Sequence, residues 1–119
     1  MRQAFAHSAE VTLSPGGDVG APGAAITVAL CGHWEHEPPC PLAPHHTSTE
    51  RVGDVLHVRT LFAVDHRRVG EVCKLIETAL ASGRLVGPDG NTTAWRLCSS
   101  RLAEVLETEL DHVGRLIQG

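Results

Sequence analysis

Three stretches of the chain alternate hydrophobic and polar residues with the period of two that is typical of β-strands. Residues 3–13 place one set of side chains on a single face, namely Phe5, His7, Ala9, Val11 and Leu13. Residues 24–34 are rich in β-branched residues and align Ile26, Val28 and Leu30. Residues 54–64 form a core face with Leu56, Val58, Phe62 and Val64, which leaves His57 and Arg59 on the other face. We therefore predict three strands.

The second half of the chain adds helical patterns. Residues 66–82 repeat apolar side chains at helical spacing, with Asp65 as N-cap and Gly83 as the stop. Residues 84–98 predict a hairpin that turns at residues 87–90 and places Trp95 in the returning strand. A last helix is predicted to begin after a Ser99 or Ser100 cap and to continue to about residue 117, with an apolar stripe of Leu102, Val105, Leu106, Leu110, Val113, Leu116 and Ile117. These elements predict one α+β domain over residues 1–119, with a small antiparallel sheet of three to five strands and two helices packed on one face.

Composition excludes several classes of partner. The net charge is −4, and the chain has ten Lys and Arg against fourteen Asp and Glu, so the basic surface of a nucleic-acid-binding protein is missing. No apolar run approaches the ~20 residues of a membrane span. The first residues lack the apolar core of a secretory signal, which predicts a cytoplasmic protein whose four Cys are thiols or metal ligands.

A cluster of Cys and His between residues 31 and 46 is the main chemical signal. Cys and His together make up twelve of the 119 residues, so a window of 16 would hold one or two by chance, and this one holds six. The six are Cys31, His33, His36, Cys40, His45 and His46. Thiolate and imidazole are the ligands preferred by zinc, copper, nickel and iron, so we predict one transition-metal ion here, zinc or copper.

The predicted elements divide this cluster into two parts. Cys31 and His33 share the non-core face of the strand over residues 24–34, ~6.5 Å apart. The other four lie in the loop expected over residues 35–50, where four prolines restrict the backbone and lower the entropy cost of ordering it around an ion. If the strands over residues 24–34 and 54–64 are neighbours, His57 lies on the same face and could add a ligand.

The remaining Cys and His have simpler interpretations. Cys73 is expected to be a buried structural thiol, and Cys98 to be packed, unless a helix N-terminus lowers its pKa. His66 and His112 are expected on helix surfaces, and His7 is expected to be a core histidine with its polar atoms satisfied. A hydrolytic triad has no support, because Ser99 and Ser100 are better explained as helix caps.

These observations leave three functional classes open. The first is a metal-binding accessory, storage or sensing protein with a closed ligand set. The second is a small metalloenzyme with an open coordination position and Glu35 or Glu37 as general base. The third is an interaction module without metal that forms a homodimer through its sheet or last helix. A polar surface loop with solvated histidines is the alternative to the metal site itself.

Overall fold

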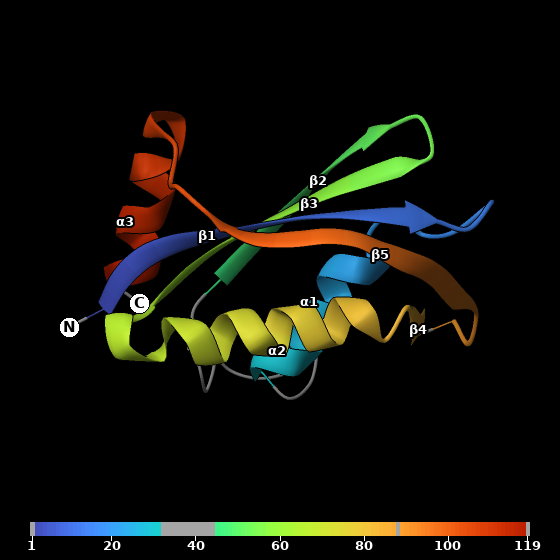
Figure 1. The fold of residues 1–119 in the computed structure, drawn as a ribbon, viewed down its shortest axis with the longest axis horizontal. Helices are drawn as coiled ribbons and strands as arrows, with labels where there is room; N and C mark the ends of the chain where they lie inside the picture. The colour runs from blue at the N-terminus through green and yellow to red at the C-terminus, as the bar shows by residue number, and fades with distance from the viewer. Residues whose placement is uncertain (1, 32–44, 88, 119) are drawn as a thin grey trace.

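The computed structural model of the protein describes residues 2–31, 45–87 and 89–118 (Figure 1). The described residues form five strands and three helices, with short 3₁₀ turns at His66–Arg68 and Glu107–Glu109. In chain order the elements are β1 (Arg2–Leu13), α1 (Ala21–Cys31), β2 (His45–Val52), β3 (Val55–Asp65), α2 (Val69–Ala81), β4 (Arg84–Val86), β5 (Thr92–Ala103) and α3 (Leu110–Gln118).

The five strands form one antiparallel sheet in the order β2-β3-β1-β5-β4. Strands β2 and β3 make a tight hairpin in which Val52 pairs with Val55, and Gly53 takes the positive φ of 63° that this turn requires. Strand β1 lies in the middle of the sheet and pairs along its length with β3 and β5. The predicted α+β class with a small antiparallel sheet is confirmed.

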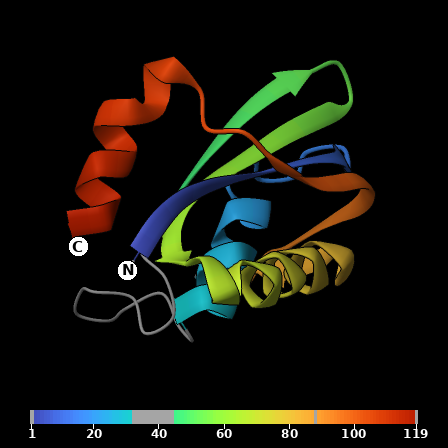
Figure 2. The same cartoon turned by 60° about the vertical axis from the view of Figure 1, so that its left-hand side comes forward.

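The larger hydrophobic core is formed by one face of the sheet with α1 and α2. Side chains at alternating positions of β1 and β3 pack with Ile26 and Leu30 of α1 and with Val72, Ile76 and Leu80 of α2. Phe62 is fully buried at its centre and stacks on Phe5, with ring centroids 5.7 Å apart. Figure 2 shows both helices on this side of the sheet.

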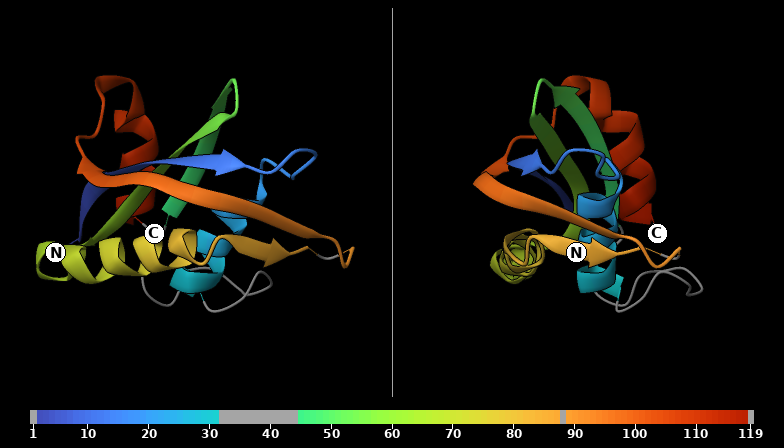
Figure 3. Two further views of the ribbon diagram at one scale, coloured as in Figure 1. Left: turned by 45° about the vertical axis from the view of Figure 1, so that its right-hand side comes forward. Right: turned by 90° about the vertical axis from the view of Figure 1, so that its right-hand side faces the viewer.

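A smaller core lies on the opposite face, under α3. Its buried members are Ala6, Leu61 and Val113, which come from β1, β3 and α3. The rotated views show α3 separated from α2 by the sheet (Figure 3). Within the described residues there are therefore three helices instead of the two predicted, and the last one packs against the other set of sheet side chains.

The predicted strand over residues 24–34 is wrong, because residues 21–31 form helix α1. The buried residues of this helix follow helical spacing: Ala21, Pro22, Ala25, Ile26 and Leu30. A continuous apolar run cannot be assigned to strand or helix from periodicity alone. Pro22 in the first turn is a helix-start signal. The strand was predicted because the β-branched triplet Ile26-Thr27-Val28 was given more weight than this proline.

The predicted start of the last helix is also wrong. Ser99 and Ser100 lie inside β5, which continues to Ala103 because it pairs with β1 as far as Ala6. The helix starts later, so Leu102 and Leu106 are exposed and not part of its apolar stripe. Long-range strand pairing has here overruled a local helical pattern.

Other predicted elements are confirmed. Asp65 caps the turn before α2 by accepting a hydrogen bond from the Arg67 amide, and Gly83 ends the helix region with a φ of 73°. The hairpin of β4 and β5 carries Trp95, whose indole N–H donates to the Leu80 carbonyl. Among the described residues, none of the helices combines the length and apolar character that a membrane-spanning segment needs.

Candidate functional site

The C-terminal half of α1 contacts the first residue of β2. The Thr27 hydroxyl and His45 Nε2 are 3.0 Å apart, and His45 is partly buried. Cys31, the last residue of α1, follows Thr27 by about one helical turn. A groove of about 310 Å³ runs beside this contact and is lined by Gly20, Gly23, Thr27, His45, His46, Thr47 and Thr49. The two elements that flank the Cys- and His-rich segment therefore meet.

His45 and His46 lie on opposite faces of β2, because neighbouring residues of a strand alternate. His45 faces α1 and is paired across the sheet with Phe62. His46 is paired with Leu61, which belongs to the core under α3. Both residues were predicted in the loop over residues 35–50, but they begin a strand. One ion bound on one side of β2 would use only one of these two histidines.

The other predicted ligands are placed as follows. Cys31 ends a helix, so the rigid Cys31–His33 pair predicted on a strand is wrong. His33, His36 and Cys40 lie outside the described residues. Over residues 2–31, 45–87 and 89–118, no three His, Cys, Asp or Glu side chains come together as a metal-binding group.

His57 does not join the predicted site. It lies on the α3 side of β3, opposite Glu50, and its Nδ1 is 3.6 Å from the Glu10 carboxylate. The condition for its inclusion was a strand over residues 24–34, and that segment is a helix on the other side of the sheet.

His46 contacts His112 of α3. Their ring centroids are 4.2 Å apart and the rings are tilted by 46°. Burial of part of the ring, followed by the proximity of His112, lowers the pKa of His46. At neutral pH the imidazole of His46 is therefore in its neutral form, with a nitrogen lone pair that can accept a proton or a metal ion.

An ion pair holds α3 against the same face of the sheet. Arg59 of β3 donates from Nε and Nη2 to the two carboxylate oxygens of Glu109, at 2.7 and 2.8 Å, and from Nη2 to the Glu104 carbonyl at 2.6 Å. Glu109 also accepts from the Leu106 amide. The hydrogen bonds from Arg59 are the main reason why the pKa of Glu109 is lowered.

We expect Arg59→Met to lower the free energy of unfolding by about 1.5–3 kcal/mol at pH 7, the range for hydrogen bonds to a charged group. Arg67→Met is the matched control, because 80% of the Arg67 side chain is exposed and its pair with Asp65 should matter little. Urea unfolding monitored by circular dichroism measures both variants. Equal losses in the two would show that the Arg59–Glu109 pair does not hold α3.

The same pair makes stability depend on pH. Because the folded-state pKa of Glu109 is lowered, its contribution is present above the unfolded-state pKa of about 4.3 and is lost as the pH falls through the folded-state value. Wild type and Arg59→Met should therefore differ most at neutral pH and converge in acid. If the difference in free energy of unfolding between wild type and Arg59→Met stays constant down to acid unfolding, the Arg59–Glu109 pair is not the cause of the pH dependence.

Another polar cluster lies on the α2 side of the sheet. His7 is only 1% exposed, and its Nε2 lies 2.8 Å from the Ser100 hydroxyl, which donates to Glu77 of α2 at 3.2 Å. Among the described residues, His7 Nδ1 has no hydrogen-bond partner. Burial, only partly opposed by Glu77, lowers the pKa of His7. The alternation of residues 3–13 correctly placed His7 in the core, but only one of its two ring nitrogens is satisfied.

The remaining cysteines belong to no group of three His, Cys, Asp or Glu side chains among the described residues. Cys73 is partly buried against the larger core, and burial raises the pKa of its thiol, which agrees with the predicted structural role. Cys98 is exposed in β5, 3.2 Å from the Thr12 hydroxyl, and no helix begins beside it.

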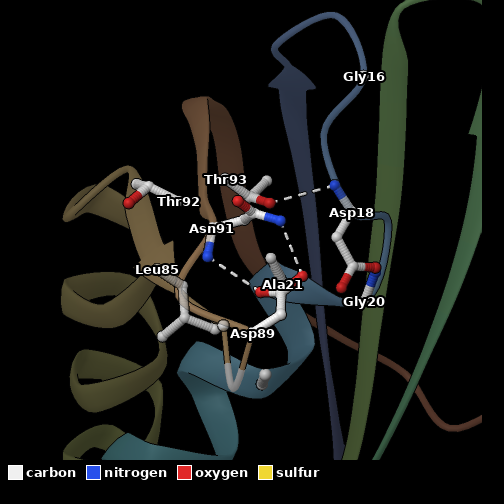
Figure 4. Close-up of a pocket in the computed structure, with 11 residues that line it drawn as sticks. Gly16, Asp18, Gly20, Ala21, Leu85, Asp89, Asn91, Thr92 and Thr93 are labelled. Carbon is white, nitrogen blue, oxygen red and sulfur yellow. Dashed lines mark hydrogen bonds between the residues drawn. The ribbon is translucent and has the colours of Figure 1, made fainter.

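A second cavity, about 830 Å³, lies between the loop before α1 and the β4–β5 turn (Figure 4). Its polar groups include the carboxylates of Asp18 and Asp89, and among its described lining residues there is no Lys or Arg. Both carboxylates already accept hydrogen bonds, from Gly20 and from Asn91 respectively. This lining disfavours phosphate and other anions. The cavity joins segments far apart in the chain, so no local pattern predicts it.

Comparison of the chain with protein-family models, with curated proteins and with solved structures gave no match. The function is therefore argued from the residues and their geometry.

Proposed function

We propose that this protein binds one transition-metal ion, zinc or copper, through the segment from Cys31 to His45, and that it acts as a metal-binding accessory, storage or sensing protein. The ligands would come from Cys31, His33, His36, Cys40 and His45. The support is the concentration of soft and borderline ligands in one segment, together with the contact that joins its two ends.

The contact between Thr27 and His45 is the observation that carries the proposal. It brings the end of α1 and the start of β2 together, so the intervening residues leave and return at nearby points. A chain segment closed in this way can surround an ion at a lower entropy cost than one with independent ends. Pro38, Pro39, Pro41 and Pro44 reduce that cost further.

The same contact would orient His45. Metal-bound histidines usually donate their second ring N–H to an oxygen, which fixes the tautomer and the direction of the ring. The Thr27 hydroxyl, 3.0 Å from Nε2, is an oxygen of this kind. The ligand set would then join a helix end to a strand start, and binding would stabilise both.

Elemental analysis of protein purified without a histidine tag or added metal tests the proposal. We expect close to one equivalent of zinc or copper, and a lower melting temperature after removal by a chelator, because an ion that binds only the folded state stabilises it. The proposal is overturned if the content of every transition metal is well below one equivalent and the melting temperature does not rise when zinc or Cu(I) is added.

A further inference from the structure

The other histidine of the pair, His46, belongs to a row of residues that crosses the sheet under α3. His46 pairs with Leu61, Leu61 with Ala6, and Ala6 with Ala103. Val113 of α3 packs on Leu61 and Ala6, and this places the preceding residue, His112, over His46. The two rings are thus brought together by the packing of α3, 4.2 Å apart between centroids.

Electrostatics disfavours a proton on His46. Partial burial of the ring, followed by the nearness of His112, lowers the pKa of His46. Glu109, three residues before His112, accepts hydrogen bonds from Arg59 at both of its carboxylate oxygens.

We infer that His46 and His112 form a second metal site, in which their two imidazole nitrogens bind one Zn²⁺ and water completes the coordination. Two imidazoles from different elements supply borderline ligands, and the exposed side of His46 leaves room for water. With only two protein ligands, the site is open and binds more weakly than a closed four-ligand site.

This site is independent of the proposed segment. His45 faces α1, whereas His46 faces α3 across the sheet, so one ion cannot be shared between the two positions. The ion would join edge strand β2 to α3, beside the Arg59–Glu109 pair that already holds the helix. Zinc would therefore strengthen the docking of α3 on the sheet.

Calorimetric titration with Zn²⁺ tests the inference in the full chain. Zinc is suitable because it does not oxidise thiols. The variant Cys31→Ser, His33→Ala isolates the second site, and we expect it to retain one weak zinc site. Adding His46→Gln or His112→Gln should each weaken that site about tenfold or more, the smallest effect expected when a ligand is removed. His66→Gln, on the exposed turn before α2, is the matched control and should change nothing.

A second measurement does not require the His46→Gln or His112→Gln variant to fold. In the Cys31→Ser, His33→Ala protein, Zn²⁺ should shift the ring resonances of two imidazoles, those of His46 and His112, in nitrogen-correlated NMR spectra. It should also slow amide exchange in α3. The inference is overturned if His112→Gln binds zinc as the parent does, or if zinc shifts neither ring. If wild type and the Cys31→Ser, His33→Ala variant bind zinc identically while both Gln variants weaken it, the segment proposal fails and this site stands.

Discussion

Phe62→Ala is expected to lower the free energy of unfolding by about 3–5 kcal/mol, the range for removing a fully buried aromatic ring. Phe62 has no exposed surface, stacks on Phe5, and lies at the centre of the core between the sheet and the two helices α1 and α2. Because domains of this size are stable by only about 5–15 kcal/mol, this one change removes a large part of the total.

The effect should reach the candidate metal segment as well, because Phe62 pairs directly with His45. Urea unfolding at fixed metal content measures the loss, and Phe62→Leu is the matched control, expected to cost under about 1.5 kcal/mol. A loss below 1 kcal/mol for Phe62→Ala, with an unchanged urea dependence, would mean that this ring is not packed in the core.

The parts of the fold that could be predicted are those determined by local pattern. Strand β3 alternates apolar and polar residues over its first half, and its predicted core face of Leu56, Val58, Phe62 and Val64 is buried. Helix α2 has both an amphipathic repeat and end signals, Asp65 and Gly83, and each takes the predicted role. In both cases short-range sequence and final packing favour the same structure.

The parts that failed depend on partners distant in sequence. Residues 24–31 are apolar except for Thr27, and their periodicity does not distinguish strand from helix. Their helical packing depends on α2 and the sheet, which are distant in sequence. Ser100 was predicted to be a cap because a helical pattern follows it. Its actual contact with His7 joins residues 93 positions apart and has no local signal. Pairing with β1 made residues 99–103 a strand, and nothing local indicates that pairing.

The candidate site shows the same division. Ligand types and their clustering are a property of the sequence, whereas the direction of each side chain depends on where strand β2 begins. Because β2 begins at His45, the two adjacent histidines point to opposite faces of the strand. The contact between His46 and His112 could not be predicted, because His112 reaches β2 only through the packing of α3.

The double variant Cys31→Ser, His33→Ala is expected to lose the tightly bound ion of the proposed segment site, with zinc affinity reduced at least about 100-fold. Two of its proposed ligands are removed, and changes to groups that merely orient a ligand already cost about 10–100-fold. Cys98→Ser, His66→Ala is the matched control, because it removes the same residue types from exposed positions in β5 and before α2. Competition with a chromophoric chelator measures each affinity.

Thr27→Val separates orientation of a ligand from its removal. Valine keeps the shape of threonine and the packing of α1, but it cannot bond His45 Nε2, so affinity should fall about 10–100-fold, less than in the double variant. Thr92→Val, at an exposed position at the start of β5, should leave affinity unchanged. If the double variant and its control bind zinc equally well, the ion does not lie in the segment. If the double variant loses zinc and Thr27→Val does not, the segment binds the ion without using the contact that joins its ends.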